Sequence, residues 1–208
     1  MSAAGRVLIG FSKPYVARYA ANAGVVTYSD GMLLARGVGT EVNPESSDDN
    51  VFRADNQDAE SAAGVFTQGT TTVTVDGLFK TAAGLIFGWP EADAQGWTHE
   101  GDSAVAPYVG YGFVAKYMSE GVISYTPYVL TKGKFGIMGT SAQTQESDIN
   151  WQTQELSLRN FRDDTANHDW RLIGSDYTTE AEAEAAIKTV FNITDSTQGP
   201  AQEPTTEP

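Results

Sequence analysis

Small and larger residues alternate over residues 105–117, and this pattern restricts the fold more than any other feature of the chain. In an extended strand, successive side chains point to opposite faces. One face of the expected strand carries Val109, Tyr111, Phe113 and Ala115. Gly110 and Gly112 fall on the other face, where they leave room for a neighbouring backbone or a packed ring. We therefore expect a central β-strand here and a further strand at 69–76, where Thr and Val alternate.

Other segments predict short strands joined by tight turns. Strands are expected at 7–10, 15–20, 25–28, 32–42, 122–130, around Phe135 and at 149–158. Asp30 and Gly31 lie between two apolar runs and predict a hairpin turn, because both residues tolerate a positive φ. Asn43 and Pro44 predict the end of the strand that follows. Residues 45–68 then have the composition of a polar, acidic loop.

Two helices are expected beside the strands. Asp76 is placed to cap a helix over about residues 78–87. A second helix at 181–191 follows Thr179 and Glu180, a capping sequence with acids in the first turn. Its apolar positions are expected to lie on a sheet: Ala183, Ile187, Val190 and Phe191. The expected fold class is mainly β (α+β), two packed antiparallel sheets that form a β-sandwich, with a flanking mid-chain helix and a C-terminal helix.

The domain organisation expected is simple. Residues 1–193 form one domain with a long connection at 43–68, since a chain of this length can bury a core without disulfides. A connection of that length in a compact domain is usually either functional or disordered. Residues 194–208 are rich in Pro, Glu and Thr, which predicts a disordered tail.

Charge and cysteine content exclude several function classes. The chain has no Cys, which removes disulfides, thiol catalysis and thiolate zinc sites. Asp and Glu outnumber Lys and Arg 27 to 13, and the net charge of −14 repels phosphate, so a nucleic-acid binder is not expected. No apolar run approaches the ~20 residues of a membrane span. Because Arg6 interrupts the short apolar N-terminus, a secretion signal is not expected either, and synthesis in the cytoplasm follows.

The sequence predicts no catalytic or metal site. His168 has Asp163 nearby, but no Gly-x-Ser-x-Gly turn accompanies them. Paired carboxylates and four Trp residues could line a sugar groove, yet four Trp are ordinary in the core and edges of a β-rich domain. The acids at 48–58 lack the spacing of a calcium-binding loop. We therefore expect a protein that is not an enzyme and that has no cofactor.

Residues 52–61, with the sequence FRADNQDAES, resemble a signature of the major tail proteins of long-tailed, siphovirus-type bacteriophages. In that family an aromatic-x-Ala-Asp-Asn segment and a Glu-Ser pair lead into a strand and a short helix, and residues 69–78 and 79–88 follow here in that order. A second match, APYVGYGFVAK at 106–116, corresponds to a Gly- and aromatic-rich central strand. The order extends over most of residues 7–192. The matching positions are Phe52, Arg53, Ala54, Asp55, Asn56, Glu60 and Ser61, with residues 107–113.

The resemblance implies a structural virion protein, the subunit of the phage tail tube. Proteins of this family form hexameric rings that stack into a non-contractile tube, and hairpins from six subunits complete an inner β-barrel. Viral DNA passes through this lumen during ejection without specific binding. The implied partners are further copies of the chain and other tail proteins, such as the tape measure, tail terminator and distal tail proteins. The implied location is the tail of the virion, with no membrane partner.

The long connection at 43–68 is expected to reach a neighbouring subunit. Inter-subunit contacts are expected at Val51, Phe52, Arg53, Asp55, Asn56, Glu60 and Phe66. Polar strand faces with residues 70–74, Gln152 and Gln154 are expected to form one wall of a channel whose acidic charge repels DNA. Two alternatives remain. One is a related tube protein of a contractile tail or secretion system, and the other, from a different class, is a carbohydrate-binding or carbohydrate-active β-sandwich.

Overall fold

The computed structural model describes residues 5–48, 50–54, 57–62, 64–144 and 151–194, and within these ranges it has ten strands and two helices. The strands are β1 (Val7–Asn22), β2 (Val25–Leu33), β3 (Gly37–Ser46), β4 (Asn50–Ala54), β5 (Gln57–Ala62), β6 (Phe66–Val75), β7 (Val109–Ser119), β8 (Val122–Phe135), β9 (Gln154–Phe161) and β10 (Arg171–Ile173). The helices are α1 (Lys80–Phe87) and α2 (Glu180–Val190). The mainly β class that the sequence predicts is confirmed.

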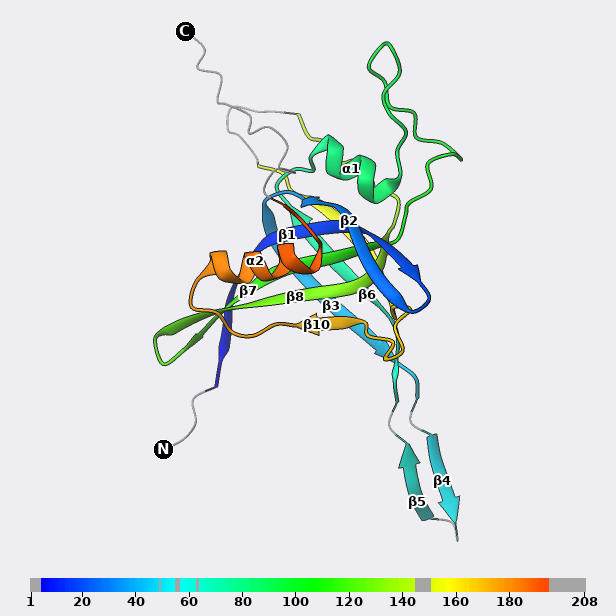
Figure 1. Ribbon diagram of the computed structural model, residues 1–208, viewed down its shortest axis with the longest axis vertical. Helices are drawn as coiled ribbons and strands as arrows, with labels where there is room; N and C mark the ends of the chain where they lie inside the picture. The colour runs from blue at the N-terminus through cyan, green and yellow to red at the C-terminus, as the bar shows by residue number, and fades with distance from the viewer. Residues whose placement is uncertain (1–4, 49, 55–56, 63, 145–150, 195–208) are drawn as a thin grey trace.

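Eight of these strands form one antiparallel sheet that folds over a common core. Its order is β2-β1-β7-β8-β9-β6-β3, and β10 pairs with β8. Strands β3 and β6 cross behind β7 and β8, so the two halves of the sheet face each other as layers of a sandwich (Figure 1). Both halves contribute buried side chains to the core: Val16, Val109, Tyr111 and Leu130 from one, and Val73, Val75, Leu156 and Leu158 from the other. The Tyr111 hydroxyl donates across this core to Thr40 Oγ1 at 3.3 Å.

The predicted turn at Asp30 and Gly31 is wrong. Strand β2 runs through both residues, and the β1–β2 hairpin turns instead at Ala23 and Gly24, whose φ values are 49° and 80°. Asp30 does have a positive φ of 54°, but it lies where the β1–β2 register shifts, in a bulge. A bulge and a hairpin turn both need residues that tolerate a positive φ, so this residue pair does not distinguish them.

The strand ends also differ from the prediction at Pro44. Strand β3 continues to Ser46, and Pro44 pairs with Gly69 of β6. Because β3 is the last strand of the sheet, the proline ring takes no hydrogen bond away from a second neighbour. Residues 45–68 are therefore mostly strand, not a loop. Strand β8 is continuous through Phe135, whereas β9 starts only at Gln154.

Helix α1 begins later than predicted and lacks the expected cap. Asp76 accepts hydrogen bonds from the backbone N–H and Nε of Arg36, so it holds the end of β6 to the segment before β3. Phe79 precedes the helix without a side-chain hydrogen bond. The helix packs its apolar face into the core through Ala82, Leu85 and Ile86.

Helix α2 lies on the sheet, as the sequence predicts, and packs against β1, β7 and β8. Ala183, Ile187 and Phe191 are buried there, but Val190 is 39% exposed, so its predicted burial is wrong. The Phe191 ring lies against Gly110 and Gly112, where an added Cβ would approach the ring carbons to 2.7 and 3.0 Å. The expected ring neighbour of these glycines is thus present, and it comes from the C-terminal helix.

Thr179 and Glu182 form a reciprocal cap at the start of α2. The Thr179 hydroxyl accepts from the Glu182 N–H, and the Glu182 carboxylate accepts from the Thr179 N–H. Thr179→Ala removes half of this cap and is expected to destabilise the protein by about 1 kcal/mol. Thermal unfolding checks this, with Thr178→Ala as the matched control that leaves the Thr179 hydroxyl in place. Equal losses in the two variants would contradict the assigned role.

Candidate assembly surfaces

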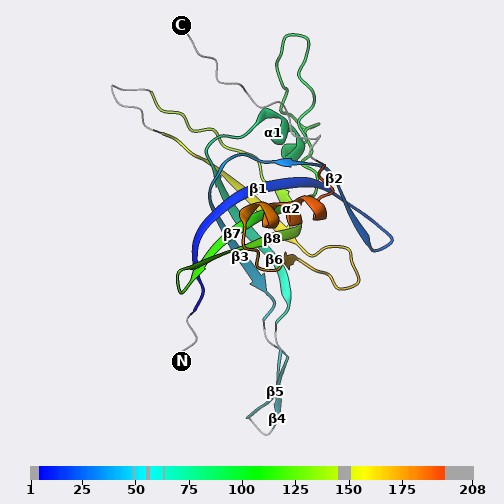
Figure 2. The same ribbon diagram turned by 60° about the vertical axis from the view of Figure 1, so that its left-hand side comes forward.

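A β-hairpin stands clear of the sandwich and is the most prominent feature of the molecule (Figures 1 and 2). We call residues 47–65, which include β4 and β5, the arm, and the remainder of the chain the body. The Ser47 N–H donates to the Val65 carbonyl oxygen at 2.9 Å, and the Val65 N–H donates to Ser47 Oγ at 3.1 Å. These two bonds close the base of the arm. The strand pairing of β3 with β6 therefore leads directly into that of β4 with β5.

The structure brings most of the predicted contact residues together on the arm. Val51, Phe52 and Arg53 lie on β4, and Glu60 lies on β5, where the register sets it opposite Phe52. Arg53 is opposite Asp58 in the same ladder. Asp55 and Asn56 lie outside the described residues.

Phe66 differs from the other predicted contact residues because it packs within its own chain. Its ring stacks on Trp170, with the centroids 4.4 Å apart and the planes 7° from parallel. Its carbonyl oxygen accepts from Arg162 Nε. The base of the arm is thus held to the segment that follows β9, a link that the sequence pattern did not reveal.

The sheet ends in two edge strands, β2 and β3. Each edge has one row of backbone groups without a partner in the described part of the chain, and such edges are templates for pairing with another chain. On β3 the side chains Glu41 and Glu45 place charges along the edge. The arm continues from this same edge strand.

The outer face of β6 is polar, as the sequence predicts. Thr70 is exposed, Thr72 and Thr74 are half-buried, and the intervening residues Thr71 and Val73 are buried. Gln152 lies before the start of β9, so its predicted place on this strand face is wrong. Gln154 is the first residue of β9 and its amide points to Met138 Sδ, which takes it away from the threonine row.

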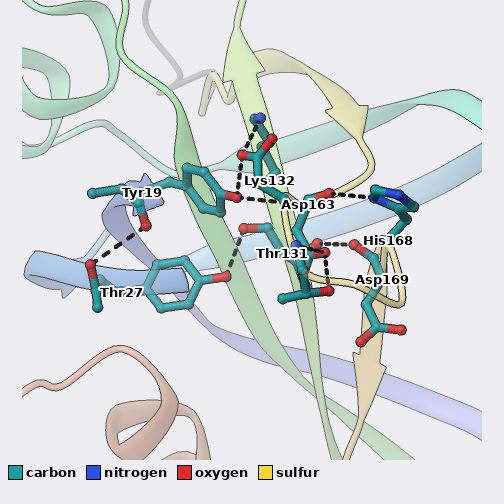
Figure 3. A network of polar contacts seen from close by, with 11 residues as sticks. Tyr19, Thr27, Thr131, Lys132, Asp163, His168 and Asp169 are labelled. Carbon is teal, nitrogen blue, oxygen red and sulfur yellow. Dashed lines mark hydrogen bonds and ion pairs between the residues drawn. The ribbon is translucent and has the colours of Figure 1, made fainter. Parts of the chain in front are cut away.

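A network of polar contacts holds the turn after β9 to β1, β2 and β8 (Figure 3). Asp164 accepts from the Tyr19 hydroxyl at 2.6 Å and from Lys132 Nζ at 2.7 Å. Lys132 and Tyr19 hold the pKa of the Asp164 carboxyl below its usual range. Burial, together with the hydrogen bond to Asp164, raises the pKa of Tyr19 to about 12. Nearby, the Tyr28 hydroxyl donates to the Thr131 carbonyl oxygen at 2.7 Å.

His168 belongs to this turn and has a left-handed φ of 54°. Its Nδ1 lies 3.3 Å from the main-chain carbonyl oxygen of Asp163, whereas the Asp163 carboxylate accepts from Thr165. The contacts of His168 are those of a residue that shapes a turn.

Beside the network a cavity of about 420 Å³ is lined by Val26, Tyr28, Asp163, Asp169, Leu172 and Val190, among others.

The four Trp residues do not share one surface. Trp89 and Trp170 pack against the core, whereas Trp97 and Trp151 are 72% and 85% exposed on separate segments. In the part of the chain that the structure describes, His, Asp and Glu side chains form no group of three or more able to hold a metal ion. Along the same ranges, neither helix has the length and apolar content that a membrane crossing requires.

Comparison with known proteins finds neither a family model nor a curated protein that matches this chain.

Proposed function

We propose that this chain is the major tail tube subunit of a long-tailed phage with a non-contractile tail. The observation that carries the proposal is the arm, a hairpin closed at its base and projecting from a two-layer sandwich (Figure 2). A hairpin alone in water is at best marginally stable, so a projecting one is best explained by a second surface that covers it in an assembly. The tail-protein signature at 52–61 falls on this hairpin.

A tube built from one kind of subunit needs a heterologous interface, in which one surface of a copy meets a different surface of the next. The arm and the two edge strands β2 and β3 are surfaces that support such contacts. We propose that further copies of the chain close into rings, with six subunits in each, and that the rings stack. Tape measure, tail terminator and distal tail proteins are the proposed partners at the inside and the ends of the tube.

The charge of the chain fits a channel for DNA. A net charge of −14 disfavours binding to phosphate, so a polymer in an acidic lumen slides without a binding site. The threonine row of β6 offers a polar, uncharged strand face for part of such a wall.

Sedimentation velocity over a range of protein concentration and ionic strength tests this proposal. The expected result is a concentration-dependent series of species at six copies and multiples of six. A glycan-binding assay on the same sample addresses the carbohydrate alternative. A single-copy species at all concentrations that binds a glycan would overturn the proposal.

A further inference from the structure

Two basic residues lie directly opposite each other on the outer face of the sheet. Lys134 of β8 and Arg159 of β9 are cross-strand partners. Arg159 is exposed and Lys134 is half-buried. Like charges at directly opposed positions of an antiparallel pair repel each other. We call these two residues the basic pair, and their position is unfavourable unless an anion neutralises them.

Within the described part of the chain, no carboxylate forms an ion pair with either member. Arg159 donates a hydrogen bond to the Gln68 amide oxygen. The Gln68 amide nitrogen in turn donates to a Glu45 carboxylate oxygen at 2.7 Å. The Gln68 amide therefore lies between Arg159 and this carboxylate. Lys134 Nζ lies 5.9 Å from the centroid of the Tyr108 ring, a cation–π distance.

Several other basic side chains of the body have carboxylate partners. Lys132, on the same face as Lys134, bonds to Asp164 at 2.7 Å. The remaining ion pairs of this kind join Arg6 to Asp176, Lys13 and Lys188 to Glu184, Arg18 to Asp30, and Arg36 to Asp76. In a chain with 27 acids and 13 bases, two adjacent bases without a carboxylate mark a surface that is complementary to an acidic partner.

The arm is an acidic partner of the right kind. Its residues 47–65 hold five acids and one Arg, and Asp58 and Glu60 lie on β5. The arm projects away from its own body (Figures 1 and 2). We infer that the basic pair is the docking surface for the arm of a second copy. This inference rests on the proposed function and names the surface that receives the arm.

DNA phosphates are a second class of anion that two cations can bind. The number of cations in the basic pair and the net charge of the chain favour the arm. Phosphate binding of useful strength needs several neutralising cations, whereas the basic pair supplies two, on a chain of net charge −14. An acidic protein segment with a few carboxylates matches two cations, and its contact gives a head-to-tail interface that continues from copy to copy.

Charge reversal tests the inference on the full-length protein. Lys134→Glu with Arg159→Glu, and separately Asp58→Lys with Glu60→Lys, are each expected to raise the critical concentration for polymerisation at least about tenfold at low salt. The protein that carries all four substitutions is expected to regain polymerisation, because the two signs are exchanged. Rescue also establishes that the body variant folds. Lys80→Glu, an exposed charge reversal on α1, is the control and is expected to polymerise normally.

The outcomes separate this inference from the proposed function. Normal polymerisation of both reversed proteins would overturn the docking surface while the tube function stands. If both charge-reversed proteins are folded but the variant with all four substitutions does not polymerise, the docking surface would also be overturned. Duplex DNA binding that is lost in the Lys134→Glu, Arg159→Glu protein while polymerisation persists would assign the basic pair to nucleic acid. Absence of polymers from the unaltered protein would overturn the proposed function and this inference with it.

Discussion

Replacing residues 48–64 with an Asn-Gly turn is expected to give a folded protein that no longer polymerises. Ser47 and Val65 already form two hydrogen bonds at the base of the arm, so a short turn can join them without moving β3 or β6. The buried core clusters are built from residues of the body. We expect the Tm to change by no more than about 4 °C and no oligomer to form at any concentration.

Thermal unfolding and sedimentation velocity measure the two effects separately. Glu120→Asn is the matched control, because it places the same Asn-Gly turn in the β7–β8 hairpin, where φ is already positive at Glu120 and Gly121. This control is expected to polymerise like the unaltered protein. Normal rings from the shortened protein would mean that the arm is not a contact between subunits.

Phe191→Ala is expected to cause a large loss of stability. Phe191 is fully buried under α2, and its ring packs edge-on against Tyr28 with the centroids 5.0 Å apart. Gly110 and Gly112 lack the side chains that would fill the space it leaves. Truncation of a buried Phe costs about 3–5 kcal/mol, which lowers the Tm by roughly 10 °C in a domain of this size.

Val190→Ala supplies the comparison for Phe191→Ala, because the neighbouring Val190 is 39% exposed and should cost far less. Similar losses of Tm in the two variants would show that packing of the Phe191 ring against Gly110 and Gly112 does not stabilise the position of α2 on the sheet. Chemical denaturation of both variants gives the free energy of unfolding directly.

The features that the sequence predicts well are those decided by local chemistry and strand periodicity. The alternation at 109–115 predicts the two faces of β7, since a strand with Gly110 and Gly112 on one side can accept a ring there. The sequence predicts the cap of α2 at Thr179 and Glu180, and the structure has Thr179 as the cap with Glu182 as its partner one turn on. Both predictions need only residues that are close in sequence or share one strand.

The features that sequence reasoning missed depend on partners far apart in the chain. Asp30 takes part in a bulge because of its register against β1, which its own residue type does not specify. Residues 45–68 have the composition of a loop, but pairing with β6 and within the arm makes most of this segment strand. Lys134 and Arg159 become a pair only through the β8–β9 register.

Negative-stain electron microscopy of the purified protein, across a range of concentration and salt, tests the central claim most directly. We expect rings or hollow tubes with six-fold end views in the unaltered protein and only small particles when the arm is replaced. Uniform particles of single-copy size from the unaltered protein under every condition would contradict this claim.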